Sequence, residues 1–144
     1  YNNDHEDLGG ETKYGISKRW YPHLNIPFLS LAEAKEIYHD DYYKPAKVHK
    51  LPYKLRYPYF DCVINTGQKR AVKILQEAVN VGAVIPLEVD GVIGQKTIKA
   101  AQSLSGKRFV AYRIKFYCKL IELKPAQEKF YYGWFQRALE TLDG

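Results

Sequence analysis

Acidic residues and glycines gather at the start of this chain, in the run YNNDHEDLGGETKYGI. The carboxylates of Asp4, Glu6 and Asp7 come just before the pair Gly9-Gly10. A carboxylate held in a fixed position can donate or accept a proton in a reaction. It can equally accept hydrogen bonds from the backbone N–H groups of its own loop. The glycines allow a tight turn or a close approach of the backbone to another molecule. The run therefore predicts either a reactive loop or a plain structured turn.

A second polar pair interrupts an otherwise apolar stretch, YPYFDCVINTG. Asp61 and Asn65 are four residues apart, so a helix would place both on one face. Polar side chains that are buried on such a face need hydrogen-bond partners. We expect Asp61 to have a structural role, such as holding the N-terminal loop in place. Asn65 either shares that role or faces a ligand.

The histidines and cysteines do not have the spacing of a metal centre. The four histidines show no helical pairing and the two cysteines are isolated, so we expect no metal and no cofactor. Cys62 and Cys118 both lie in apolar helical patterns, and we expect two buried thiols rather than a disulfide. The sequence also has no phosphate-binding loop, no dinucleotide motif and no Gly-x-Ser-x-Gly elbow.

The elements that must position the polar groups are mostly helices. Residues 1–28 are polar and contain glycine and proline, which predicts a structured loop with little helix. Ser30 and Glu33 form a capping box that predicts the start of a helix, and Pro45 ends the pattern. The segment around Asp61 reads as a second helix that ends or bends at Thr66-Gly67.

Apolar periodicity predicts more helices in the second half of the chain. They cover residues 68–81 and 107–123, with a short helix beginning near residue 95 and a last helix that has Pro125 at its first position. The turn Asp90-Gly91 precedes the short helix. The prediction is a mostly α domain of five to six helices, with little strand and an N-terminal motif loop.

The composition restricts the class of partner. The net charge of +6 favours an anionic partner, but the basic residues form no long block, so a nucleic-acid-binding arm is not expected. The chain has thirteen Tyr, and aromatic rings serve cores more often than the sugar-binding grooves that they can also line. No signal peptide or long apolar span is visible, and we expect no stable membrane insertion.

Three motifs in order resemble the glycoside hydrolase family 108 muramidases, once called secretion activator proteins. The first is Tyr1-x-Asn3-Asp4-x-x-Asp7-x-Gly9-Gly10-x-Thr12-x-x-Gly15-Ile16, and the second is the FDCVINTG segment. From LEVDGVIGQKT onward the chain is similar to the predicted peptidoglycan-binding region that follows in this family. The matching residues there are Asp90-Gly91-x-x-Gly94, Thr97, Tyr112-Arg113 and Phe130-x-x-Gly133-Trp134-x-x-Arg137-Ala138.

This resemblance implies a fold and a reaction. It implies a lysozyme-like catalytic region over residues 1–85 and a peptidoglycan-binding region over residues 86–144 that packs against it. The reaction would be hydrolysis of the β-1,4 bond between N-acetylmuramic acid and N-acetylglucosamine. In the family, Glu-Gly-Gly precedes the tyrosine that Tyr1 matches, and that Glu is the catalytic acid. The sequence begins with Tyr and contains no Met, so we expect this Glu just upstream of Tyr1.

The resemblance also implies roles for individual residues. Asp7 is the first candidate for a second catalytic carboxylate, before Asp4 and Glu6, and a capping role within the loop is an equal alternative. Thr12 would hydrogen-bond the catalytic water or a sugar hydroxyl, or would form a local turn bond. The candidates for substrate binding are Gly9, Gly10, Tyr14, Tyr43 and Asn65. From their residue type, Tyr14 and Tyr43 would stack on or hydrogen-bond sugars, and a place in the core is an equal alternative for both.

In the peptidoglycan-binding region, ordinary structural roles are the default expectation. Trp134 is expected in the core, and Arg113 and Arg137 on solvated helix faces, although either arginine could reach an anionic carboxylate.

Other functions remain open at this point. A lytic transglycosylase uses a single acid and closes a 1,6-anhydro ring instead of admitting water. A noncatalytic wall-binding or secretion-accessory protein would lack the Glu before Tyr1. A nucleic-acid binder would explain the charge but none of the motifs. The resemblance implies a bacterial or phage source and action in the periplasm or at the cell wall, by holin-assisted release or a dedicated secretion route.

Overall fold

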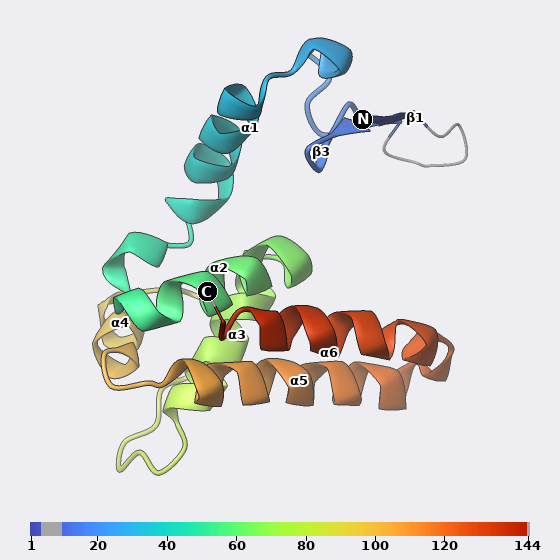
Figure 1. Cartoon of the computed structure of the whole chain (residues 1–144). Helices are drawn as coiled ribbons and strands as arrows, with labels where there is room; N and C mark the ends of the chain where they lie inside the picture. The colour runs from blue at the N-terminus through green and yellow to red at the C-terminus, as the bar shows by residue number, and fades with distance from the viewer. Residues whose placement is uncertain (4–9, 144) are drawn as a thin grey trace. The chain divides into compact units, whose positions relative to one another are not determined.

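The structure is a computed structural model of the chain, and it describes residues 1–3 and 10–143 (Figure 1). It divides into two compact units, Tyr1–Asp41 and Tyr42–Gly144. Six α-helices occur in the described residues, together with three short strands. The prediction of a mostly α, lysozyme-like domain with an N-terminal motif loop is therefore confirmed.

The first unit begins with a small antiparallel sheet in the order β1-β2-β3. Its strands are Asn2–Asn3, Glu11–Lys13 and Ile16–Ser17. The turn between β2 and β3 consists of Tyr14 and Gly15, which both have positive φ, 52° and 80°. Two consecutive residues with positive φ form the type of turn that matches the twist of a two-residue hairpin. The motif loop predicted from sequence thus contains a hairpin. The sequence did not predict this hairpin because its strands are too short to show an alternating pattern.

The rest of this unit packs under the sheet. A 3-10 turn, η1 (Ile26–Phe28), leads to α1 (Leu31–Tyr38). The predicted capping box is present, because Ser30 Oγ accepts the Glu33 N–H and the Glu33 side chain accepts the Ser30 N–H. A small apolar cluster holds the unit together: Ile16, Ile26, Leu29 and Ala34. A π-helix, η2 (His39–Tyr43), follows α1.

The second unit is a helical bundle. Its elements are η3 (Val48–Lys50), α2 (Tyr53–Thr66), α3 (Gln68–Val79), α4 (Gln95–Ala101), α5 (Gly106–Leu123), η4 (Pro125–Phe130) and α6 (Tyr131–Glu140). In Figure 1, α5 and α6 lie side by side, and α5 also packs on α2 and α3. The core of this bundle is apolar and includes Leu55, Tyr59, Leu75 and Phe109, each with no measurable exposure. Burial of such side chains contributes about 1.5–3 kcal/mol each.

The turn before α4 is tied to α3 by one side chain. Gln76, 1% exposed, donates through Nε2 to Asp90 Oδ1 at 2.9 Å, and its Oε1 accepts the Gly91 N–H at 3.0 Å. Gly91 has φ +77°, and a Cβ there would lie 2.7 Å from Lys69 Cγ and 3.1 Å from Lys69 O. Asp90 Oδ1 also accepts the Val92 N–H, and these hydrogen bonds lower the pKa of Asp90 below its ordinary value of 3.8. The predicted turn at Asp90-Gly91 is therefore a fixed junction between two helices.

Two expectations differ from the structure. The last α-helix begins at Tyr131, because Pro125 starts the 3-10 segment η4 instead of α6. Cys62 is buried and Cys118 is exposed, and both are free. The apolar pattern around Cys118 misled the prediction because α5 buries only part of its circumference in the bundle.

Candidate functional site

Part of the predicted site lies outside the described residues. This applies to the candidate catalytic carboxylate Asp7, to its alternatives Asp4 and Glu6, and to Gly9. Of the remaining candidates, Gly10, Thr12 and Tyr14 belong to the first unit. Tyr43 and Asn65 belong to the second.

The hairpin fixes the candidates of the first unit in the backbone. Gly10 has φ +69°, a conformation that favours glycine, and Lys18 N–H donates to Glu11 O at 2.8 Å beside it. Thr12 is in the middle strand, where it faces Asn2 on one side and Ser17 on the other. Its hydroxyl donates to the carbonyl of Gly10 at 3.4 Å, which is the local turn bond given above as its alternative role.

Tyr14 is at the tip of the hairpin and is 45% exposed. The hydroxyl of Tyr38, from α1, donates to the carbonyl of Tyr14 at 2.7 Å and so supports the turn from below. A Cβ on Gly15 would overlap that same hydroxyl, so this position requires glycine for space as well as for φ. The phenol ring of Tyr14 is thus presented on a rigid turn, with Lys13 Nζ 5.4 Å from its centroid. An exposed ring on a rigid support can stack on the apolar face of a sugar.

Tyr43 lines a groove of the second unit that we call the tyrosine groove. This groove has a volume of about 680 Å³ and is bounded by α2, the start of α5 and the residues after α6. Tyr43 packs edge-on against Phe60, with ring centroids 5.0 Å apart. Tyr53 and Tyr57 are 84% and 50% exposed beside it.

The charges around the tyrosine groove are positive. Its lining includes Lys54, Arg56 and Lys107 and no Asp or Glu. Arg56 is held in place because its guanidinium donates to the carbonyls of Leu51 and His49, at 2.9 and 3.0 Å. Exposed phenol rings with flanking cations suit a sugar polymer that carries negative charge.

The polar pair of α2 belongs to a buried network that sequence reasoning only partly anticipated. Asp61 Oδ2 accepts a hydrogen bond from Arg113 Nη1 at 2.8 Å. Arg137 Nε and Nη2 donate to the same carboxylate, at 3.0–3.2 Å. Asp61 therefore has the structural role expected of it, but its partners come from α5 and α6.

Asn65 takes part in the same network. Arg113 Nε donates to the Tyr117 hydroxyl at 2.9 Å, and that hydroxyl donates to Asn65 Oδ1. Burial raises the pKa of Tyr117, against the opposing charge of Arg113, so the phenol stays protonated and can donate. Asn65 thus has a packing role, and its role in substrate binding stays a prediction.

The two arginines correct the expectation of solvated helix faces. Arg113 has no measurable exposure, and Arg137 has 44% of its side chain exposed but is paired with Asp61. Because 52 and 76 residues separate them from Asp61, no local sequence signal reveals the pairing. Trp134 lies where expected, partly buried and stacked on Tyr117 with ring centroids 5.1 Å apart.

Within residues 1–3 and 10–143, no group of three His, Cys, Asp or Glu side chains is arranged to hold a metal ion. No helix of the same part has the length and apolar character to cross a membrane.

The fold is that of a mostly α, lysozyme-like domain. Residues 1–67 match the family model described as glycosyl hydrolase 108, and residues 70–139 match the model described as predicted peptidoglycan domain. The chain belongs to the glycosyl hydrolase 108 family and carries its peptidoglycan-binding region. This makes it a glycoside hydrolase with a role at the cell wall.

A solved structure supports the same assignment. The chain is similar to Brucella abortus SagA, with a TM-score of 0.75 and 25% sequence identity over 99% of this chain and 83% of that chain. No curated protein matches the chain.

Proposed function

We propose that this protein is an N-acetylmuramidase, which hydrolyses the β-1,4 bond between N-acetylmuramic acid and N-acetylglucosamine in peptidoglycan. The observation that carries the proposal is the family match over residues 1–67, which contains the N-terminal motif and the FDCVINTG segment. The match of residues 70–139 to a predicted peptidoglycan domain supports the same polymer as substrate.

The proposed chemistry needs two groups. A protonated carboxyl group must donate to the leaving oxygen, and an apolar pocket that raises its pKa would keep the proton on near neutral pH. We assign this role to the Glu expected just upstream of Tyr1. A second carboxylate must orient water about 6.5–9.5 Å from the acid in an inverting enzyme, or lie closer as a nucleophile in a retaining one. Asp7 is the candidate for this role.

The remaining candidates would bind and position the substrate. Thr12 would hydrogen-bond the water or a sugar hydroxyl, and the turn at Gly9-Gly10 would bring the backbone close to the sugar. Tyr14 would stack on a sugar ring. Tyr43 would do the same within the tyrosine groove, whose cations would favour the anionic polymer.

The proposed organisation keeps the division predicted from sequence. Residues 1–85 would form the catalytic region and residues 86–144 the region that binds peptidoglycan. The Asp61 network supports their close association, because it joins α2 of the first region to α5 and α6 of the second.

Product analysis tests the reaction. Purified peptidoglycan would be digested with protein that includes the residues encoded before Tyr1, and the soluble fragments identified by mass spectrometry. We expect fragments that end in reducible muramic acid. Anhydro ends would instead establish a lytic transglycosylase. If the polymer stays uncut and circular dichroism shows that the protein is folded, the result would favour a noncatalytic wall-binding or secretion-accessory function.

Two variants test the assignment of the second carboxylate. Asp7→Asn is expected to lower kcat by about two orders of magnitude or more, because the group that activates water is removed. Asp4→Asn is the matched control, since it removes the same charge from the same loop, and it is expected to keep most of the activity. Wild-type activity in Asp7→Asn would exclude Asp7 from the reaction, and a loss in Asp4→Asn alone would transfer the role to Asp4.

A further inference from the structure

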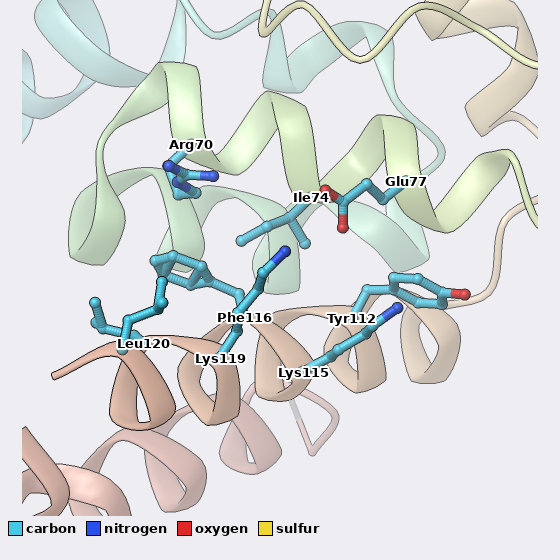
Figure 2. Close-up of a pocket in the computed structure, with 9 residues that line it drawn as sticks. Arg70, Ile74, Glu77, Tyr112, Lys115, Phe116, Lys119 and Leu120 are labelled. Carbon is cyan, nitrogen blue, oxygen red and sulfur yellow. The ribbon is translucent and has the colours of Figure 1, made fainter. Parts of the chain in front are cut away.

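A second groove lies between α3 and α5, and none of its lining residues is one of the catalytic or substrate-binding candidates named above (Figure 2). It has a volume of about 500 Å³, which is within the usual range of small-ligand sites. All of its lining residues fall between Arg70 and Leu123, so the groove lies entirely within the stretch that matches the predicted peptidoglycan domain.

The groove carries three cations and one carboxylate. Lys115 and Lys119 are four residues apart on one face of α5, and Arg70 comes from α3. Glu77, also on α3, is the single acid of the lining. Among the described residues, Glu77 forms no ion pair with either lysine. The groove therefore has an excess of positive charge and a separate position that accepts a cation.

Aromatic rings position two of these cations. The Arg70 guanidinium lies 5.0 Å from the Phe116 ring centroid, and Lys115 Nζ lies 5.2 Å from the Tyr112 centroid. Such cation–π contacts favour one side-chain orientation over the others. Figure 2 shows the α3 and α5 side chains directed toward each other across the groove.

The floor between the charges is apolar. Ile74 lies between Arg70 and Glu77 on α3, and Phe116 and Leu120 face it from α5. Leu123 is 73% exposed at one end of the groove. A ligand that fills this space would cover apolar surface in addition to pairing its charges.

We propose that this groove binds the acidic stem peptide of peptidoglycan, an inference that rests on the proposed function. Such a peptide has several carboxylates, a diamino residue whose side chain ends in a free amine, and small methyl side chains. Its carboxylates would pair with Arg70, Lys115 and Lys119, and its amine with Glu77. The methyl groups would lie on the apolar floor at Phe116 and Leu120.

The dimensions agree with this occupant. Arg70 and Glu77 are seven residues apart on one helix, which is about 10 Å along its axis. Three extended residues of a peptide span about the same distance. A nucleic acid would place phosphates beside Glu77, and a flat lipid surface would not enter a groove. The peptide alone matches both signs of charge.

Binding of a synthetic stem tetrapeptide to the full chain tests the proposal, with amide chemical shifts measured during titration. We expect saturable shifts confined to α3 and α5. The double variant Lys115→Gln/Lys119→Gln is expected to weaken binding about tenfold at low salt, since each exposed ion pair contributes about threefold. Lys96→Gln is the control, because Lys96 is an exposed lysine outside the groove.

A second comparison tests the position of the amine. Glu77→Gln is expected to weaken binding of the tetrapeptide about threefold, and to leave binding of the same peptide with an acetylated amine unchanged. Equal losses for the two peptides would overturn the assignment of the amine to Glu77.

Three results would overturn the proposal as a whole: absence of saturable shifts, equal affinity in the double variant and the control, or tighter binding of single-stranded DNA or acidic vesicles at the groove. Hydrolysis of peptide-free glycan, measured in parallel, separates this proposal from the proposed function. Hydrolysis without peptide binding would refute only the proposal that the groove binds the stem peptide. Peptide binding without hydrolysis would refute only the proposed muramidase activity.

Discussion

Asp61→Asn is the substitution that best tests how α2, α5 and α6 are held together. In the native protein the Asp61 carboxylate faces the guanidinium of Arg113, whose side chain has no exposure, and that of Arg137, which is 44% exposed. Asparagine keeps the size and one oxygen acceptor but removes the charge. Arg113 would then be a buried cation without a counter-charge, and its Nη2 already lacks a hydrogen-bond partner in the structure described.

The expected loss of stability follows from the burial of Arg113. Removal of one partner from a buried ion pair lowers the free energy of unfolding by about 3–5 kcal/mol. Asparagine keeps one hydrogen bond, so we expect the lower end, about 3 kcal/mol. This is a large part of the 5–15 kcal/mol that is usual for a domain. Arg137→Gln is the matched control, since its half-exposed pair is expected to contribute at most about 1 kcal/mol.

Urea unfolding measures both values, because urea does not screen charges as guanidinium does. Tryptophan fluorescence in a Trp20→Phe background comes from Trp134 alone, which stacks on Tyr117 next to the network and reports on this part of the bundle. The double variant Asp61→Asn/Arg113→Met should recover more than half of the loss, since it removes the uncompensated cation. A loss below about 1 kcal/mol for Asp61→Asn, or a loss equal to that of Arg137→Gln, would refute this reasoning.

Three further predictions use the same unfolding assay or a binding assay. Gly91→Ala should lower the free energy of unfolding by about 1–3 kcal/mol, because residue 91 has a φ of +77° and a Cβ there would press on Lys69. Gly133→Ala, in open space on α6, should raise the free energy of unfolding by about 0.5–1 kcal/mol. A loss of stability in both variants would contradict the strain argument. The lowered pKa of Asp90 stabilises the fold above about pH 3.8, its ordinary value, and this contribution is lost as the pH falls through the lower native pKa. The stability difference between wild type and Asp90→Asn should therefore shrink toward acid, and a constant difference would refute it. Tyr53→Ala should weaken glycan binding about fivefold with unchanged stability, since its ring is 84% exposed; unchanged binding would exclude stacking there.

Local sequence signals were sufficient for most helix boundaries. The capping box at Ser30 and the end of α2 at Thr66-Gly67 depend on hydrogen bonds and dihedral angles within a few residues. The sequence alone was therefore sufficient to predict them. Pro125 was less informative, because proline suits the first turn of a 3-10 segment as well as that of an α-helix.

The pairing of distant residues was decided only by tertiary structure. Asp61 and Asn65 were recognised as a polar pair that needs partners, but nothing in the sequence points to Arg113, Tyr117 or Arg137. The N-terminal motif resembled a family through residue types at fixed spacing, which are local properties of the sequence. The grooves required the packing of α2, α3 and α5, because a groove is formed by side chains that are neighbours only after folding. The sequence therefore determined the helices and the family, and the tertiary structure determined which charges are paired and which remain available to a ligand.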